Sequence, residues 1–501
     1  MSTLNSTDAN FIYSETPSTP MSIASVQIME LPKETSPQAF VLGLREFLTA
    51  RLHLVPYLTN VPQWSSGILN RPRWIKTDSI NIEDHVYEVP VPAPGGRAQI
   101  EQTVAQLHEQ PLPRSRPLWD LAVLTGIGES QVAYYSRVHH ACLDGVSAQA
   151  STAQLMDRAD EDGSKKAAIP AVHGKRQSIA EHVLEFFADA TKQMVNDVYL
   201  APVRTRSIAK VTQRALHPAK RLGHTFTPAP RTMLNRTIDH SRTFAMGEIQ
   251  LDDVRQIAKS TGTSINDIFL SICGGALRRY LVRHNACPEQ SLIAGCPVSM
   301  RKPGDLSNDN QVALMRVSLE TRQEDPLARL RAIHASSCAA KEVTAELYSL
   351  MTPTVTAPFI GPATAGMSQL MGIIPDAEPL TTPPINVLIS NVPGPRESLF
   401  SNGAKMRTHY PVSIPAHGVG VNITVQSYVD HLYFGITACA KTLPDAGALR
   451  NDMLAEWQSI KAVLLAEVLD FRTAAKPPST AEPSKTPTER APQADTDQQV
   501  A

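Results

Sequence analysis

The chain has 501 residues, with 47 Lys and Arg against 48 Asp and Glu, so its formal net charge is -1. This balance gives no support for nucleic-acid binding, which needs a clustered excess of basic residues. Hydrophobic residues make up 42% and charged residues 19% of the chain, which excludes a mainly disordered protein and indicates a globular one of mixed α/β class. The length allows about three domains, or two large ones with connecting segments.

Two further classes are excluded. Met1–Glu15 contains no Lys or Arg and no apolar core, so it does not predict a secretory signal. No segment approaches the roughly 18 consecutive apolar residues of a membrane-spanning helix. The six cysteines form no CxxC pair, which argues against disulfides or a zinc site and suggests reduced thiols in a cytoplasm. We therefore expect a cytoplasmic protein whose contact with a membrane is peripheral.

The first part of the chain alternates strand and helix patterns. After a turn-rich start, period-two patterns predict strands over Ile23–Met29, Leu118–Leu124 and Gln131–Val138. Apolar residues at helical spacing predict helices over Ser36–Leu52, Thr103–His108 and Val146–Arg158. A charged, glycine-containing loop then marks a boundary near residue 165.

The middle of the chain has two notable segments. Ile179–Leu200 carries one apolar helical stripe, which fits a helix packed on its own protein or one docked on a membrane surface. Tyr199–Ile238 contains no acidic residue and eight Lys or Arg residues. Two interpretations remain open for this segment, a solvated linker and a contact with the anionic phosphates of lipid headgroups or a nucleotide.

A second domain is predicted from residue 239. Its expected helices are Val254–Lys259, Ser264–Tyr280 and Ala446–Leu469, and its expected strands are Ile293–Met300, Ile385–Ile389, Val419–Gln426 and Leu432–Cys439. The segment Ser390–Pro395 (SNVPGP) is expected to stop the second of these strands. The predicted organisation is a first domain over 1–165, a helical and basic linker over 166–238, a second domain over 239–472 and a disordered tail over 473–501.

One cluster of residues suggests chemistry, the HHxxxDG sequence of His139–Gly145. Because it ends a predicted strand, His139 and His140 should point to opposite faces, with Gly145 allowing a tight turn into the next helix. Two such histidines cannot easily share one metal ion, so we expect no metal site. The chain has no G-x-S-x-G nucleophile elbow and no phosphate-binding glycine loop. A single histidine acting as general base fits this pattern best.

His139–Gly145 resembles the signature of the chloramphenicol acetyltransferase-like superfamily, and the chain as a whole resembles the bacterial wax ester synthase/acyl-CoA:diacylglycerol acyltransferases. The narrower resemblance rests on further stretches in order along Asn10–Arg472: Glu15-Thr16-Pro17, Pro117-Leu118-Trp119, Asn266-Asp267, Pro297-Val298-Ser299-Met300-Arg301, SNVPGP and Tyr410-Pro411.

This resemblance implies two α/β domains, each a mixed sheet with helices, joined by a helical linker and meeting at a cleft. It implies that His140 takes a proton from an acceptor hydroxyl as the oxygen attacks an acyl-CoA thioester, and returns it to the leaving CoA thiol. No metal or organic cofactor is then needed. The expected partners are acyl-CoA, diacylglycerol or a long-chain alcohol, and the surface of a membrane or lipid inclusion; a homodimer is left open.

Roles for the other motif residues follow from the same resemblance. His139 would be structural or help to position the acceptor. Asp144 would point away from the substrate and form an ion pair that holds the loop, because a buried carboxylate needs a partner. Arg301 is our candidate for that partner, and Arg137 and Arg116 are its rivals.

The remaining candidates each have a functional and a structural interpretation. Asn266 and Asp267 would shape the acyl or acceptor channel, or cap a helix and contact the other domain, and we favour the second. Trp119 is expected to pack in the core. The amides around Ser390 and Asn391 would face CoA or the oxyanion, or simply form a fixed turn.

Two other functions remain as alternatives. One is a condensation-type enzyme that joins carrier-bound acyl groups to amines, although no carrier domain follows. The other is a catalytically silent lipid-binding or lipid-droplet protein, although the HHxxxDG residues are intact. The sequence does not choose between alcohol and diacylglycerol as acceptor.

Overall fold

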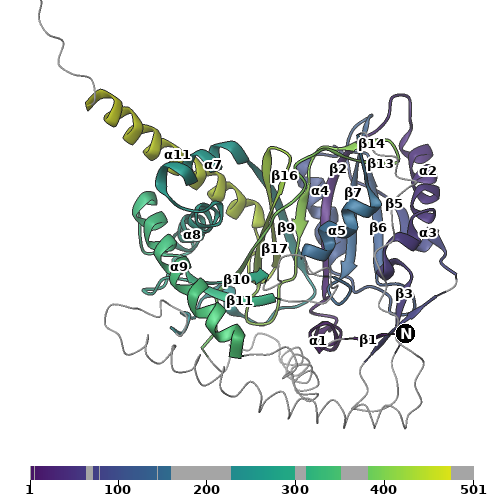
Figure 1. Cartoon of the computed structure of the whole chain (residues 1–501), viewed down its shortest axis with the longest axis horizontal. Helices are drawn as coiled ribbons and strands as arrows, with labels where there is room; N and C mark the ends of the chain where they lie inside the picture. Colours follow the sequence, from purple (N-terminus) through teal and green to yellow (C-terminus); the bar gives the residue numbers. More distant parts are fainter. Residues whose placement is uncertain are drawn as a thin grey trace, which may run out of the picture.

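The two halves of the chain form two sheets that stand next to each other, each with helices on its outer side (Figure 1). The computed structural model describes residues 2–4, 6–63, 72–77, 79–143, 145–159, 227–299, 312–350 and 382–474. The predicted helix over 179–200, most of the basic segment, and the predicted tail from 475 onward lie outside these residues. The mixed α/β class expected from composition and pattern is confirmed.

The first sheet has eight strands in the order β5-β6-β7-β2-β14-β13-β8, with β15 also paired to β2. Their bounds are β2 Ser22–Glu30, β5 Val86–Pro90, β6 Trp119–Thr125, β7 Gln131–His139, β8 Asp157–Arg158, β13 Leu399–Ser401, β14 Ala404–Met406 and β15 Tyr410–Val412. The strand β2 is central because both of its edges are used, with β7 on one side and β14 and β15 on the other.

Three of these strands come from the second half of the sequence. Lys405 of β14 lies opposite Glu30, and Tyr410 of β15 lies opposite Val26, both in antiparallel register. The first structural unit therefore contains chain from outside residues 1–165. The two halves share a sheet as well as a cleft.

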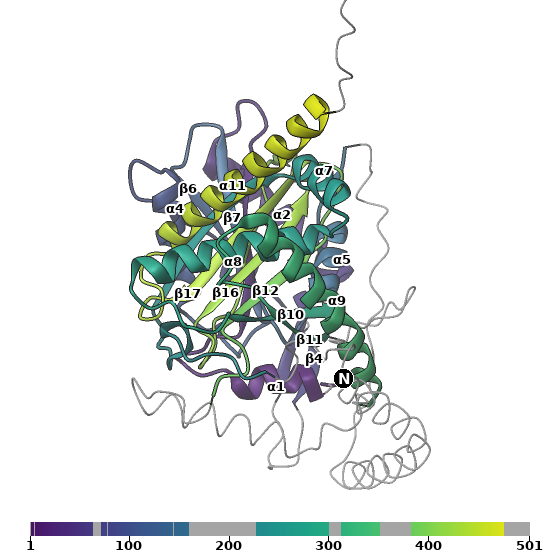
Figure 2. The ribbon, with the colours of Figure 1, turned by 90° about the vertical axis from the view of Figure 1, so that its left-hand side faces the viewer.

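The second sheet has six strands in the order β11-β10-β12-β16-β17-β9. Their bounds are β9 Arg242–Gln250, β10 Ile293–Ser299, β11 Val312–Ser318, β12 Val387–Val392, β16 Val421–Tyr428 and β17 His431–Cys439. A layer of helices covers the face turned away from the first sheet (Figure 1, Figure 2). These are α7 Leu251–Thr261, α8 Ile265–Arg283, α9 Pro326–Leu350 and α11 Ala446–Ala474. Apolar residues of α8 and α11 pack on the sheet to form the larger core, for example Phe269 and Trp457.

The first half has its own helices and a small third sheet. The helices are α1 Ser6–Ser14, α2 Pro37–Thr49, α3 Ile82–His85, α4 Arg97–His108 and α5 Gly145–Leu155, with short 3₁₀ turns at Leu52–Leu54, Pro56–Leu58 and Met233–Asn235. The third sheet pairs β1 Ser2–Thr3, β4 Arg73–Lys76 and β3 Asn60–Gln63. None of the described helices is long and apolar enough to cross a membrane.

A carboxylate from α4 ties the two halves together. Glu101 accepts hydrogen bonds from the Met246 amide of β9 (2.9 Å) and from Arg450 of α11 (2.8 Å). Burial raises the pKa of this carboxyl above its ordinary value, although those two donors oppose the shift. The bond to Met246 satisfies a backbone donor on β9, the edge strand of the second sheet.

The structure corrects several predicted elements. The helix predicted to reach Arg158 ends at Leu155, because residues 157 and 158 join the first sheet as β8. The strand predicted to stop at Ile389 runs on through Val392. The last helix continues to Ala474, two residues into the predicted tail. The helix α1 was not predicted at all, and its position proves central to the site.

Candidate active site

A cavity of about 180 Å³ lies between the two sheets, and His140 is one of its lining residues. The walls come from β2 and β7 of the first half and from β12, β15 and β16 of the second half. The lining is mixed, with apolar side chains such as Ile23 and Val412 and polar ones such as Ser136 and Thr424. A cavity at the junction of two units with a few polar groups is a typical ligand site.

The ring of His140 is held from one side by helix α1. Its ring centroid lies 4.1 Å from that of Phe11, with the two planes 9° apart. Its backbone amide donates to the Met21 carbonyl (2.8 Å) just before β2. The ring is half-buried and faces the cavity on the side of β7 that also carries Ser136 and Val138. The predicted period-two arrangement of His139 and His140 is therefore present.

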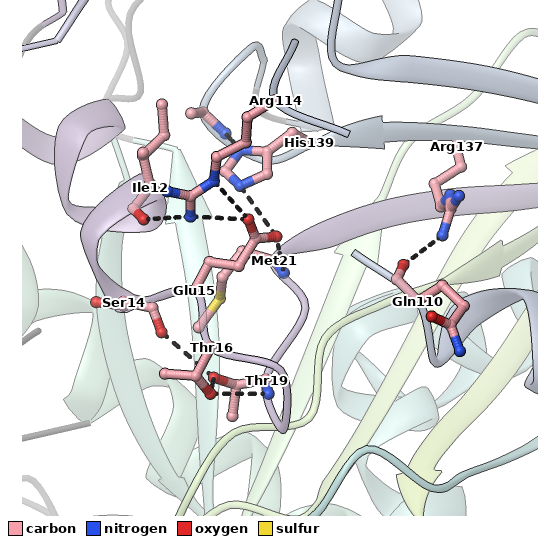
Figure 3. Close-up of polar contacts among 11 residues, drawn as sticks. Ile12, Ser14, Glu15, Thr16, Thr19, Met21, Gln110, Arg114, Arg137 and His139 are labelled. Atoms are coloured by element: carbon pink, nitrogen blue, oxygen red, sulfur yellow. Dashed lines mark hydrogen bonds and ion pairs between the residues drawn. The ribbon is translucent and has the colours of Figure 1, made fainter. Parts of the chain in front are cut away.

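His139 points into the protein instead, with 1% of its side chain exposed. Its Nδ1 accepts the amide proton of Ala141 (3.1 Å), and its Nε2 lies 3.5 Å from Oε1 of Glu15 (Figure 3). Because Nδ1 accepts, the neutral ring carries its proton on Nε2, toward the carboxylate. This side chain fixes the loop that carries His140.

Glu15 is the centre of a small ion-pair network (Figure 3). Its carboxylate accepts from the Met21 amide (3.1 Å) and from Arg114 (2.9 Å), and Arg114 also donates to the Ile12 carbonyl (3.1 Å). Burial alone raises the pKa of Glu15, but the contacts with His139, the Met21 amide and Arg114 outweigh burial and lower the pKa to about 2. The carboxylate is therefore ionised at neutral pH and anchors α1 to the histidine loop.

Asp144, the loop acid, and Arg301, its predicted partner, lie outside the described residues. Gly145 begins helix α5, as the tight turn requires. Arg137, one rival partner, is committed elsewhere: its Nε lies 3.0 Å and its Nη2 2.5 Å from the two oxygens of Asp120. Its Nη1 donates to the Leu107 and Gln110 carbonyls. The other rival, Arg116, donates to the Asp84 carbonyl.

Asn266 and Asp267 lie in the first turn of α8. Ser264 is the N-cap, and it exchanges hydrogen bonds with Asp267 in a capping box. Asp267 is 1% exposed and also lies 2.8 Å from Nδ1 of His334. Although burial raises its pKa, the His334 and Ser264 hydrogen bonds lower it below the ordinary value of an aspartate. The helix-capping interpretation of Asp267 is therefore confirmed.

Successive SNVPGP residues of β12 lie on opposite faces of the strand and line different cavities. Ser390 and Val392 line the His140 cavity, whereas Asn391 faces the opposite side. There its amide donates to Oδ1 of Asn266 (3.4 Å), so two motifs that are 125 residues apart meet. Asn266 and Asn391 both line a second cavity, of about 460 Å³.

Gly394 explains the shape of the turn that follows β12. A Cβ at this position would lie 1.9 Å from the Ser427 carbonyl oxygen. The Gly394 amide itself donates to Oγ of Ser427 (2.9 Å), so it is used inside the turn. These contacts favour the fixed-turn interpretation of the SNVPGP segment at Gly394.

Trp119 lies in the core and does not line either cavity. Its indole Nε1 donates to the Leu58 carbonyl (3.1 Å), and its ring stacks on His85 at 4.3 Å. This packing agrees with the structural interpretation of Trp119.

Sequence reasoning missed the polar side chains around His409 in the His140 cavity. His409 lies there between Gln426 (3.2 Å to Nδ1) and Gln27 (3.5 Å to Nε2), and all three side chains line the cavity. Burial lowers the pKa of His409 to about 4, so its ring is neutral at pH 7. Only the neighbouring Tyr410-Pro411 pair pointed to this region. Phe11 was missed in the same way, because nothing in its local sequence links it to residue 140.

Comparisons with known proteins agree with this geometry. Residues 4–269 match the wax ester synthase/diacylglycerol acyltransferase catalytic domain, and residues 308–461 match the WS/DGAT C-terminal domain. The probable diacylglycerol O-acyltransferase tgs2 of Mycobacterium tuberculosis is 32% identical over 440 residues, covering 87% of this chain and 94% of that protein. The O-acyltransferase WSD of Acinetobacter baylyi is 30% identical over 481 residues, covering 95% of this chain and 100% of the relative.

A solved structure extends the agreement to the fold. The wax ester synthase/diacylglycerol acyltransferase from Marinobacter aquaeolei VT8 matches with a TM-score of 0.64 and 26% identity, covering 92% of this chain and 99% of that one. The fold expected from the resemblance is therefore confirmed, with two α/β units around a shared cleft. The chain belongs to the wax ester synthase/diacylglycerol acyltransferase family.

Proposed function

We propose that this acyltransferase moves a fatty acyl group from acyl-CoA to diacylglycerol, to a long-chain alcohol, or to both, with His140 as general base. The observation that carries the proposal is the position of one imidazole, that of His140, at a cavity walled by both halves of the chain. An acceptor and a donor must meet at the base, so the base has to border a cavity. Apolar walls suit acyl chains, and the polar side chains suit a hydroxyl group.

The chemistry needs one group that both takes up and releases a proton. His140 accepts the proton of the acceptor hydroxyl as its oxygen attacks the thioester carbonyl. The tetrahedral intermediate then collapses, the carbon–sulfur bond breaks, and the imidazolium returns the proton to the CoA sulfur. Stacking on Phe11 and the anchored loop of His139 support this role by keeping the ring in one orientation.

The test is the rate of ester formation from labelled palmitoyl-CoA with dioleoylglycerol or hexadecanol. We expect His140→Ala to lower kcat by about 1000-fold, within the range typical for loss of a general base. The matched control is His53→Ala, because His53 is exposed and distant in sequence from the motif. If His140→Ala forms product at the wild-type rate while remaining folded, the proposal fails.

We also propose that the protein meets its lipid substrates by peripheral binding, through the basic segment within Tyr199–Ile238. The support is its composition, eight basic and no acidic residues, which favours anionic headgroups. Charge reversal at Arg204, Arg206 and Lys210 should weaken binding to phosphatidylglycerol vesicles at low salt. Unchanged binding would contradict this proposal and leave the segment as a linker.

A further inference from the structure

One cysteine of this chain is exposed, and it is Cys338 in helix α9. The other five are buried or half-buried, at Cys142, Cys273, Cys287, Cys296 and Cys439. Burial raises the pKa of Cys296 to about 12, with the Asp267 charge adding to the shift, and burial raises the pKa of Cys142 and Cys273 as well. A thiol reagent in solution will therefore meet Cys338 first.

Two further side chains form a chain of contacts with this thiol. Sγ of Cys338 lies 3.7 Å from Nε2 of His334, which precedes it by one turn of the same helix. Nδ1 of His334 lies 2.8 Å from Oδ2 of Asp267, and that carboxylate is fixed by the capping box with Ser264. Because the carboxylate holds the proton of neutral His334 on Nδ1, the lone pair of Nε2 faces the sulfur.

This order of groups is the signature of an activated nucleophile, in which a base lies beside the nucleophile and a third group orients the base. His334 has 39% of its side chain exposed, so the pair is open to a reagent from outside. The capping of α8 explains why Asp267 is present. Capping does not explain why His334 and Cys338 of α9 lie next to it. The group lies apart from His140, since none of its three members lines the His140 cavity.

We propose that Cys338, His334 and Asp267 form a second nucleophilic centre, at which Cys338 accepts an acyl group from an acyl-CoA thioester. The choice of acyl-CoA rests on the proposed function. As Sγ attacks the thioester carbonyl, the thiol proton moves to Nε2 of His334. The bond from the carbonyl carbon to the CoA sulfur then breaks, and His334 returns the proton to that sulfur. The products are acyl-S-Cys338 and free CoA, and no oxidant or reductant is consumed.

The residues near Cys338 favour an acyl-CoA thioester as the electrophile. Lys341 lies one turn beyond Cys338 and lines the second cavity, which is also lined by Asn266, the neighbour of Asp267. Lys341 and Arg396 give the rim of that cavity positive charge, which suits the phosphates of CoA. Cys296, the thiol that lines this cavity, is buried, and its raised pKa keeps it protonated.

The experiment incubates the full-length protein with palmitoyl-CoA and no acceptor, then measures intact mass and maps the modified peptide. We expect one hydroxylamine-sensitive palmitoyl group on Cys338, absent in Cys338→Ser. We expect His334→Gln to slow acylation about 100-fold, because its amide still donates to Asp267 but cannot take up the proton. Cys287→Ser is the matched control and should be acylated at the wild-type rate.

Two readouts keep the proposal falsifiable. Alkylation of Cys338 by iodoacetamide, compared between wild type and His334→Gln, reports activation of the thiol without acyl-CoA. The proposal is overturned if Cys338 alkylates readily but is never acylated, if acylation falls on another cysteine, or if His334→Gln is acylated as fast as wild type. His140→Ala separates the two proposals, since it should abolish ester formation and leave acylation of Cys338 unchanged.

Discussion

Replacing Glu15 by Gln tests whether the buried carboxylate really anchors helix α1 and the histidine loop. The side chain is 4% exposed, and its pKa is lowered from 4.5 to about 2 by the partners described above. One pKa unit corresponds to about 1.4 kcal/mol, so the ionised carboxylate contributes about 3 kcal/mol to the free energy of unfolding at neutral pH. Glu15→Gln keeps the shape of the side chain but removes this contribution.

The pH dependence gives the sharper test. Because the folded pKa lies below the ordinary one, the stabilisation is complete above about pH 5 and is lost as the pH falls toward 2. Urea unfolding should therefore show wild type more stable than Glu15→Gln by about 3 kcal/mol at pH 7 and by about 1 kcal/mol at pH 3.

The control is Glu129→Gln, which removes an exposed carboxylate and should change the free energy of unfolding by less than about 0.5 kcal/mol. A difference between wild type and Glu15→Gln that is small at pH 7, or that does not shrink on acidification, would refute the reasoning.

Three further predictions follow from single contacts. Asp120→Asn should lower the free energy of unfolding in urea by about 3 kcal/mol, because it leaves the buried Arg137 without its counter-charge. The double variant Asp120→Leu with Arg137→Met should recover most of that loss. Full stability of the single variant would contradict a buried ion pair. Gly394→Ala should destabilise the protein by about 2 kcal/mol in the same assay, since its Cβ would overlap the Ser427 carbonyl; an unchanged midpoint would show that the turn can move. Gln426→Leu should lower kcat/KM for diacylglycerol about tenfold more than for hexadecanol, because it removes a donor that can hold an ester carbonyl in the cavity. Equal losses for the two acceptors would exclude a role of Gln426 in holding the ester carbonyl.

The strongly patterned elements were predictable from sequence, and they include the ones that present the motif. The strand ending at His139, the helix begun by Gly145 and the capped helix at Ser264 all follow from local rules. The opposite orientation of His139 and His140 follows from the geometry of a strand alone. Local pattern was sufficient wherever a residue's role depends on its own element.

Local pattern failed where a residue's role depends on a distant one. The nine residues of α1 have no clear apolar repeat, and the helix is held by packing of Leu4 and Ile12 against Ala141. The stacking of Phe11 on His140 is a consequence of that packing. The three-residue strands β13, β14 and β15 are too short for a period-two signal. Pairing with β2 makes β14 and β15 strands, and pairing with β14 and β8 makes β13 one. The continuation of β12 past Ile389 likewise depends on its neighbour β16.

The way β2 is completed has a consequence for biosynthesis. One of its edges pairs with β7, but the residues that pair with its other edge are 384 positions further along the chain, as for Val26 and Tyr410. A ribosome adding roughly 5–20 residues per second therefore exposes an open strand edge for about 20 seconds or more before the missing strands emerge. During that interval the nascent chain offers a template for pairing with other chains, so a chaperone that shields β2 would raise the yield of folded enzyme. It also follows that residues 1–165 expressed alone would retain this open edge, and separating the two halves would yield aggregates rather than an isolated domain.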